Sequence, residues 1–336
     1  MFNASFSVWF MRKLLILATL LLFLATGTAP LVRAADDPVQ RAIAWLHTQQ
    51  RPDGSFGGAS VTADVVYVLA LAGENPAGPA WTQPGGQSAL DALAAVAPVY
   101  VYSDAGQAGK VARAVALAGG NPRAFGGLDL IDIIQKAYDR ATGRYSPMLL
   151  YRHTLAMEGL KRAGVPVPVA ALDALLRAQL PDGGWFWSFD AETSDVDTTG
   201  RVMQVLAGQM GVRCVSGYSR AANYLATGQL ATGGWGVLPS PDGNPANANS
   251  TGLAVAGLKA AGFDPDAPPF QKNGLGAQAS LLTFQEASGA FVYIQEPDKH
   301  EVRLMATADA LNALLQPMAQ PATCRSLYLP LVLRQG

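Results

Sequence analysis

The sequence contains little cysteine and little charge. Two cysteines occur among 336 residues, and charged residues make up only 15% of the chain. Two cysteines exclude a disulfide-dense scaffold and any zinc site built from four cysteines. Lysine and arginine number 24 and aspartate and glutamate 25. Because there is no basic excess to neutralise phosphates, nucleic acid is not an expected partner. Half of the residues are hydrophobic, which excludes a disordered chain.

Only one stretch of the chain is long and apolar, at residues 14–25, and it directly follows Arg12 and Lys13. Val32 and Ala34 supply the small residues that a signal peptidase requires before its cleavage point. The pattern predicts a signal peptide over residues 1–34, cleaved after Ala34, and a secreted, extracytoplasmic protein without a membrane anchor. The alternative is a retained anchor, although twelve apolar residues are short for a membrane span.

A repeated motif is the strongest signal in the sequence. The motif consists of a glutamine, a glycine four residues later and an aromatic residue two residues after the glycine. It occurs four times. A weaker copy begins with Asp139 and ends at Tyr145. Each copy follows one helical pattern and precedes a second that begins near a threonine. The full copies are Gln50–Gly54–Phe56, Gln179–Gly183–Trp185, Gln229–Gly233–Trp235 and Gln285–Gly289–Phe291, and the threonines are Thr62, Thr154, Thr199, Thr251 and Thr307.

The repeat predicts an all-α protein. One degenerate unit fits between the first and third, which gives about six units of two helices each over residues 35–318. An open stack would need polar caps at both ends, whereas a closed ring needs none. The glycine permits a turn with positive φ, the aromatic ring fills the gap between helix pairs, and the glutamine hydrogen-bonds helix ends. Residues 319–336 form an apolar C-terminal tail.

The motif around Gln179, Gly183 and Trp185 resembles the QW repeats of the squalene-cyclase and prenyltransferase superfamily. That resemblance implies an (α/α)6 toroid over nearly the whole mature chain. The superfamily includes class II terpenoid cyclases, protein prenyltransferase β subunits, cobalamin carriers and complement-type thioester domains. The motif is therefore specific for the fold and poor as a guide to function.

The resemblance to class II terpenoid cyclases implies a catalytic acid. These enzymes protonate an alkene with the middle aspartate of an Asp-x-Asp-Asp motif, and this chain has Asp195, Asp197 and then Thr198. Asp197 would be the general acid and Asp195 its neighbour, but Thr198 replaces the last aspartate. The cyclases also place their cavity between two helical domains, and this chain holds one toroid. The alternative interpretation makes Asp197 a helix N-cap.

Other activities of the superfamily lack their residues in this chain. Protein prenyltransferases bind zinc with an Asp, a Cys two residues later and a distant His. Thioester domains need a Cys three residues before a Gln. Neither pattern occurs in this chain. We therefore expect no metal and no cofactor.

A cobalamin carrier would need a second, β-rich domain. An inverting carbohydrate-active enzyme would need two separated carboxylates, and Asp190, Glu192, Asp195 and Asp197 follow an aromatic stretch. Those rings could instead pack the repeat corner.

The functional prediction is non-catalytic binding of a ligand or partner at the mouth of the barrel. The loop from the aromatic residue to the threonine lengthens from six positions in the first unit to sixteen in the last two. Long loops on one side of a repeat ring often carry function. The partner would be a small molecule, a glycan or a protein. The candidate contacts are Trp185, Trp187, Asp190, Asn247 and Asn249. The alternative is a class II cyclase-like enzyme that uses Asp197.

Cys214 and Cys324 form a disulfide candidate. Export would expose both thiols to an oxidising compartment, where a pair tends to be bonded. A bridge between them would join the linker before the fifth unit to the C-terminal tail and would pin the tail across the toroid. The alternative is two unrelated buried thiols that act as small hydrophobic residues.

Overall fold

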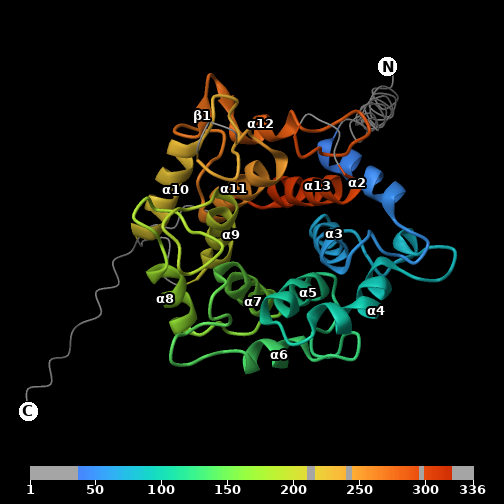
Figure 1. Ribbon diagram of the computed structural model, residues 1–336. Helices are drawn as coiled ribbons and strands as arrows, with labels where there is room; N and C mark the ends of the chain where they lie inside the picture. The colour runs from blue at the N-terminus through green and yellow to red at the C-terminus, as the bar shows by residue number, and fades with distance from the viewer. Residues whose placement is uncertain (1–36, 210–215, 240–243, 295–298, 320–336) are drawn as a thin grey trace, which may run out of the picture.

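The computed structural model describes residues 37–209, 216–239, 244–294 and 299–319. The predicted signal peptide, nearly all of the predicted tail, Cys214 and Cys324 lie outside these ranges. Twelve α-helices in the described part form two concentric rings, as Figure 1 shows. The predicted all-α toroid of helix pairs is confirmed. No helix among the described residues has the length and apolar character needed to cross a membrane.

Six helices form the inner ring and six the outer ring, and they alternate along the chain (Figure 1). The last inner helix packs against the first, which closes the ring. A 3-10 turn, η1 (Pro79–Trp81), and a short hairpin of β1 (Gln271–Lys272) and β2 (Leu275–Gly276) are additions that the repeat did not predict. The inner helices are α3 (Ala59–Leu71), α5 (Ala105–Leu117), α7 (Leu150–Arg162), α9 (Val196–Leu206), α11 (Ala248–Ala261) and α13 (His300–Leu315). The outer helices are α2 (Pro38–Gln49), α4 (Ala89–Val101), α6 (Leu130–Lys136), α8 (Val169–Arg177), α10 (Ser216–Gly228) and α12 (Ala277–Leu282).

The motif glutamines join neighbouring units. In each full copy the side-chain amide donates to the carbonyl of its own motif glycine and to a backbone carbonyl of the following unit. Gln285 donates to Gly289 O at 3.0 Å and to Pro38 O at 2.8 Å. The last corner is thus bonded to the first helix, so the same interaction that links consecutive units also closes the ring.

The motif glycine and aromatic residue act as the sequence predicted. Gly183 has φ of +98°, and a Cβ there would lie 2.4 Å from Arg220 O, so only glycine fits. Trp185 and Trp235 are fully buried. The indole N–H of Trp185 donates to Leu175 O at 2.7 Å, and that of Trp235 makes the equivalent bond to the outer helix before it. Each ring therefore fills a corner and satisfies its polar atom there.

The corner threonine ties each aromatic residue to the inner helix that follows. The backbone N–H of Trp185 donates to Thr199 Oγ1 at 2.9 Å, and the other three full copies repeat this bond. In the weaker copy the partner is His153 and not Thr154: Tyr145 N donates to His153 Nδ1 at 3.1 Å. Burial lowers the pKa of His153 to about 4, so its ring is neutral and can accept this bond.

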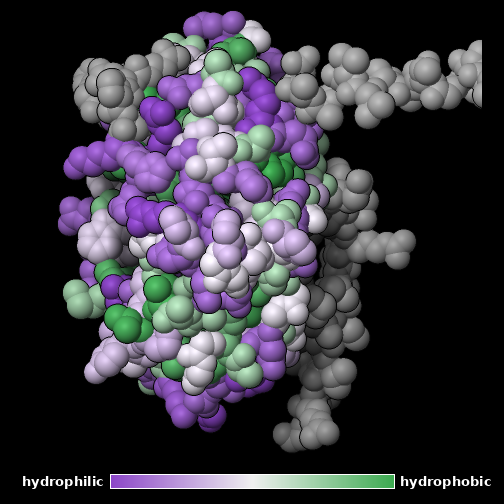
Figure 2. Space-filling view, turned by 90° about the vertical axis from the view of Figure 1, so that its right-hand side faces the viewer, coloured by the Kyte–Doolittle hydropathy of each residue, from purple (hydrophilic) through white to green (hydrophobic). Residues whose placement is uncertain are grey.

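Glycines on the inner helices bring neighbouring backbones into contact. A Cβ on Gly109 of α5 would lie 2.2 Å from Leu155 O of α7, and one on Gly257 of α11 would lie 2.5 Å from Gly200 O of α9. These close approaches narrow the inner ring, so its interior must be filled by side chains and not by a wide channel. On the outside, the face turned to the viewer in Figure 2 is largely polar, with hydrophobic side chains in small separate groups.

Candidate functional site

The inner helices line the lumen with residues at matching positions. The reference position is the corner threonine, His153 in α7, and Ala108 in α5, which has no threonine. Lumen-facing positions lie two residues before, two after and five after this reference, a spacing that follows one face of a helix. The residues therefore form three layers below the helix N-termini. The mouth layer includes Ser60, Tyr151, Asp197, Asn249 and Met305; the middle layer Asp64, Lys110, Arg201 and Asp309; the deep layer Tyr67, Arg113, Glu158, Gln204 and Asn312.

The middle and deep layers are joined by ion pairs. Asp64 lies 2.6 Å from Lys110 Nζ and 2.7 Å from Arg113 Nη2. Arg113 Nη1 lies 2.9 Å from Glu158 Oε2, and Arg201 Nη1 lies 3.8 Å from the same oxygen. Because these groups come from four different inner helices, the network ties the helices together across the lumen.

The network holds both of its central acids in the ionised form. Burial raises the pKa of Asp64 most strongly, but Lys110 and Arg113 outweigh it and keep that pKa below its usual range. The pKa of Glu158 is lowered in the same way by Arg113 and Arg201. A pocket lined by residues of these two layers, among them Asp64, Arg113 and Arg201, has a volume of about 10 Å³, about what one water molecule needs. At this depth the described lumen is thus polar and nearly filled.

The structure corrects the predicted role of Asp197 as a helix cap. The N-cap of α9 is Asp195, whose carboxylate accepts from Thr198 N at 2.6 Å, from Thr198 Oγ1 at 2.9 Å and from Trp187 N at 3.1 Å. Asp195 has the extended backbone of a cap, whereas Asp197 is the second residue of the helix. Asp197 therefore faces the mouth layer, and its Oδ1 is buried without a hydrogen-bond partner among the described residues.

Two carboxylates near the mouth are poorly compensated. Burial raises the pKa of Asp197 to about 6, the charge of Asp195 adds to the effect, and the nearby Ser250 hydroxyl and Arg201 reduce it. Burial also raises the pKa of Asp309 to about 6, because its nearest cation, Arg201 Nη2, is 4.0 Å away. Both groups are mostly ionised at neutral pH and largely protonated at pH 5.

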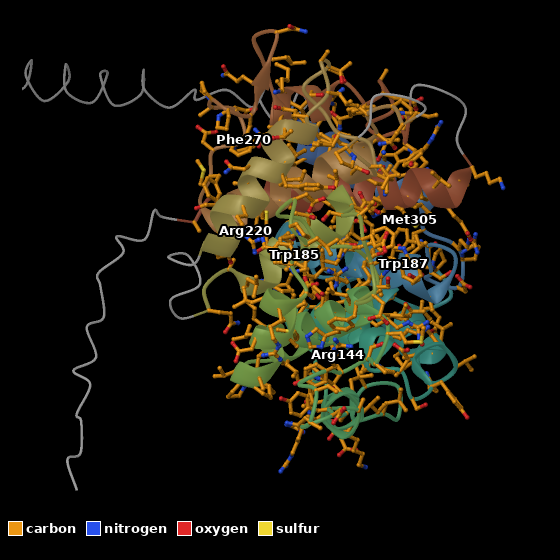
Figure 3. All side chains as sticks on the ribbon, turned by 60° about the vertical axis from the view of Figure 1, so that its left-hand side comes forward. Arg144, Trp185, Trp187, Arg220, Phe270 and Met305 are labelled. Carbon is orange, nitrogen blue, oxygen red and sulfur yellow. The ribbon has the colours of Figure 1, made fainter. Side chains whose placement is uncertain are left out.

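The predicted ligand contacts separate into two groups. Trp185 is fully buried in its corner, which contradicts its predicted role as a ligand contact. Asn247 is also buried, and its Oδ1 accepts from Ser250 N at 2.8 Å as the cap of α11. In contrast, Trp187 is 51% exposed and Asp190 is exposed, both on the loop before α9. Asn249 lies in the mouth layer. Figure 3 shows Trp187 and Met305 on the same side of the molecule and Trp185 inside it.

Asn249 links the mouth to the charged layers below. Its Nδ2 donates to Asp309 Oδ2 at 2.9 Å, and its Oδ1 is buried and has no hydrogen-bond partner in the described part of the chain. Asn249 Oδ1 and Asp197 Oδ1 therefore form a pair of unsatisfied acceptors on neighbouring helices. Within the described ranges, no grouping of histidine, cysteine, aspartate and glutamate is arranged to hold a metal ion.

The charged lumen residues were not singled out from the sequence. Asp64, Arg113, Glu158 and Asp309 lie in separate repeats, and each looks locally like a polar residue in an amphipathic helix. Asp64 and Asp309 share one signal, a position two residues after the corner threonine, whereas Glu158 is counted from His153 and Arg113 lies on a helix without that threonine.

The fold defines the class of protein: the chain is an α/α toroid of helix pairs, and its resemblance to solved terpene cyclases is a resemblance of fold. No protein-family model and no curated protein sequence matches it. Among solved structures it resembles the type II terpene cyclase MstE from Scytonema, with 14% identity, a TM-score of 0.58, and coverage of 84% of this chain and 98% of that one. It also resembles ent-copalyl diphosphate synthase from Streptomyces platensis, with 18% identity and a TM-score of 0.51, covering 78% of this chain and 50% of that one.

The comparison with MstE corrects one expectation. We expected class II cyclases to need two helical domains, but this single toroid covers 98% of the MstE chain. The number of domains therefore does not argue against a cyclase. Since identities of 14% and 18% establish the fold alone, the activity must be argued from the residues of the lumen and mouth.

Proposed function

We propose that this protein is an exported toroid that binds a ligand at the barrel mouth without transforming it. The observation that carries the proposal is the ion-pair network of the middle and deep layers, which occupies the lumen where a cyclase would fold its substrate. A polyene carbocation needs an apolar enclosure, whereas Asp64, Arg113 and Glu158 put charged groups there. Export is supported by the basic and apolar segments of residues 12–25 and the small residues before position 35.

The mouth layer indicates what the ligand would carry. Asp197 Oδ1 and Asn249 Oδ1 are buried acceptors without a hydrogen bond in the described structure, and the nearby Ser250 hydroxyl is also unpaired, so donor groups on a ligand would find acceptors here. Met305 is 36% exposed and Trp187 is 51% exposed, and Figure 3 shows both on the same side of the molecule, so both are available for apolar contacts. We propose a ligand with an amino or hydroxyl donor group attached to an apolar body.

Native mass spectrometry of the protein purified from its own host tests this proposal. We expect a co-purified small molecule on the wild-type protein and on Asp173→Asn, which alters an exposed residue of the outer helix α8. We expect it to be lost from Asn249→Leu, which removes one unsatisfied acceptor, and weakened in Asp197→Asn. Retention of the molecule by Asn249→Leu, or wild-type protein that carries no ligand, would contradict binding at the mouth layer.

A class II cyclase is the second candidate, and the state of Asp197 favours it. A carboxyl group with a pKa of about 6 is partly protonated near neutrality, as an alkene-protonating acid must be. Incubation at pH 6 with squalene, farnesyl diphosphate or geranylgeranyl diphosphate is expected to give no cyclic product, because the lumen is charged and filled. A cyclic product that disappears in Asp197→Asn would establish the cyclase in place of the binding protein.

A further inference from the structure

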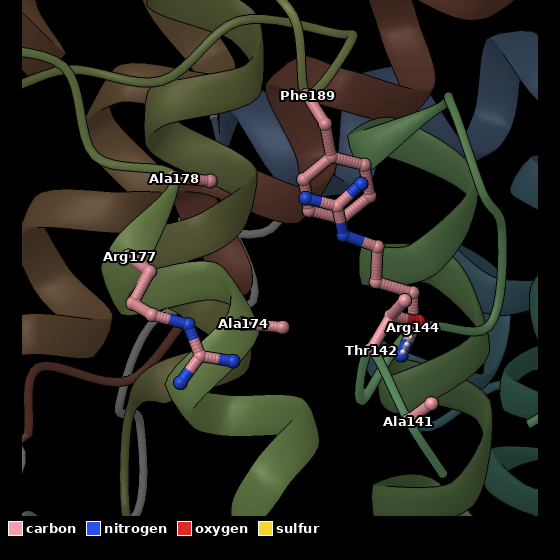
Figure 4. A pocket seen from close by; sticks show the side chains of 7 residues that line it. All are labelled: Ala141, Thr142, Arg144, Ala174, Arg177, Ala178 and Phe189. Carbon is pink, nitrogen blue, oxygen red and sulfur yellow. Dashed lines mark hydrogen bonds between the residues drawn. The ribbon is translucent and has the colours of Figure 1, made fainter. Parts of the chain in front are cut away.

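A second pocket lies on the outer part of the ring, between the turn before α7 and helix α8. Its volume is about 360 Å³, which is within the range of small-molecule sites. Arginines from the two elements approach it from opposite sides, and Figure 4 shows Arg144 and Arg177 with the small side chains between them. The lining residues are Ala141, Thr142, Arg144, Ala174, Arg177, Ala178 and Phe189.

Arg144 is held in a fixed orientation at one wall. Its guanidinium carbon lies 3.8 Å from the centroid of the Phe189 ring, and its Nη1 donates to Pro147 O at 3.1 Å. Its backbone N–H also donates to Thr142 Oγ1 at 3.3 Å (Figure 4). A guanidinium fixed by stacking loses little freedom when it binds an anion, and the N–H groups that Pro147 does not use remain available.

The two positive charges of the pocket are not neutralised by the protein. Arg177 lies on the last turn of α8 and is exposed, and neither it nor Arg144 forms an ion pair within the described ranges. The nearby carboxylate of Asp139 is turned into its own loop, where it accepts from Thr142 Oγ1 at 2.7 Å and from Ala141 N at 2.9 Å. The hydrogen bond from Thr142 lowers the pKa of Asp139, so that acid is committed to the turn.

The remaining surface of the pocket is apolar. Ala174 is buried and lies between the two arginines in Figure 4, Ala178 is half-buried, and Ala141 is exposed at the edge of the pocket near Arg144. Inorganic phosphate would interact with the two arginines and leave the apolar surface exposed to water. An organic anion would contact both the arginines and the apolar surface.

We propose that this pocket binds a small organic carboxylate, with the carboxylate between Arg144 and Arg177 and the apolar body on the alanine surface. Planar guanidinium groups match the two oxygens of a carboxylate, and such charge-assisted bonds are about twice as strong as neutral ones. The pocket shares no lining residue with the mouth layer, so this proposal does not depend on the proposed function.

Calorimetric titration of the full chain with hexanoate, with the neutral hexanamide and with inorganic phosphate tests the assignment. Hexanoate is expected to bind at least about tenfold more tightly than hexanamide, because only the acid interacts with both guanidinium groups. Arg177→Gln is expected to weaken hexanoate binding by about tenfold or more. The matched control is Lys136→Gln, which removes a cation from the last turn of α6, outside the pocket, and should leave binding unchanged.

Three results would overturn the proposal. Equal affinity for hexanoate and hexanamide would show that charge does not direct binding. Phosphate binding as tightly as hexanoate would show that the apolar surface contributes nothing and that the site is a general anion site. Unchanged hexanoate affinity in Arg177→Gln, with the unfolding transition of the variant matching that of the control, would place binding elsewhere on the protein.

Discussion

Replacing Trp235 with alanine is expected to lower the free energy of unfolding by about 3–5 kcal/mol, the usual cost of truncating a buried tryptophan. Trp235 is fully buried, its indole N–H donates to Leu225 O at 2.7 Å, and its backbone N–H donates to Thr251 Oγ1 at 3.0 Å. The alanine variant keeps the backbone bond and loses both the packing and the bond to Leu225. Two helix pairs meet at this corner, so the cavity cannot collapse without moving both.

Urea unfolding followed by circular dichroism measures this effect, and two variants serve as controls. Trp235→Phe keeps most of the packing and removes the indole bond, so it should cost about 1–3 kcal/mol. Trp187→Ala removes an exposed ring and should change stability by no more than about 0.5 kcal/mol. A loss in Trp235→Ala no larger than that in Trp187→Ala would contradict the corner-filling role.

The fold could be predicted from the sequence because its determining interactions are local. In each corner, Gln, Gly and the aromatic residue lie within seven positions of one another, and the glutamine amide donates to the carbonyl of its own motif glycine. The helix cap was assigned to Asp197, whereas the structure places it at Asp195. Both aspartates lie just before the threonines of α9, and the sequence pattern does not reveal which of them precedes the first helical residue. In the weaker copy the sequence pattern points to Thr154, but His153, one residue earlier, takes the position of the corner threonine.

The lumen could not be predicted in the same way because its contacts are made across the ring. Asp64 and Lys110, or Arg113 and Glu158, are about one repeat apart, and each pair meets only when two inner helices adopt the same register. That register depends on close approaches such as Gly109 to Leu155 O, which are tertiary contacts. Sequence patterns within one helix show an amphipathic face but not what the facing helix places opposite it.

The contents of the lumen bear on which of the functions that share this fold the protein has. The Asp-x-Asp motif and the toroid both fit a cyclase, so neither feature separates a cyclase from a binding protein. The structure adds that the acid at Asp197 stands above a layer of ion pairs and not above an apolar chamber.

Replacing Arg113 with methionine is expected to destabilise the protein by about 3–5 kcal/mol, because it leaves two buried acids with too few cations. Arg113 is 4% exposed and contacts Asp64 and Glu158 at 2.7 Å and 2.9 Å. Methionine keeps much of the side-chain volume, so the loss of stability reflects the missing charge more than missing packing. Arg123→Met removes an exposed ion pair with Asp129 at 3.4 Å and should cost less than about 1 kcal/mol.

The pH dependence identifies the charge as the cause. The pKa values of Asp64 and Glu158 lie below their usual 3.8 and 4.5 in the folded protein. Lowered pKa values stabilise the folded state above those usual values, and this stability is lost as pH falls through the folded pKa. The difference between wild type and Arg113→Met should therefore be constant from pH 6 to pH 8 and should shrink below about pH 4. Urea unfolding across this range measures it, and a difference that stays constant down to pH 3 would show that Arg113 acts through packing alone.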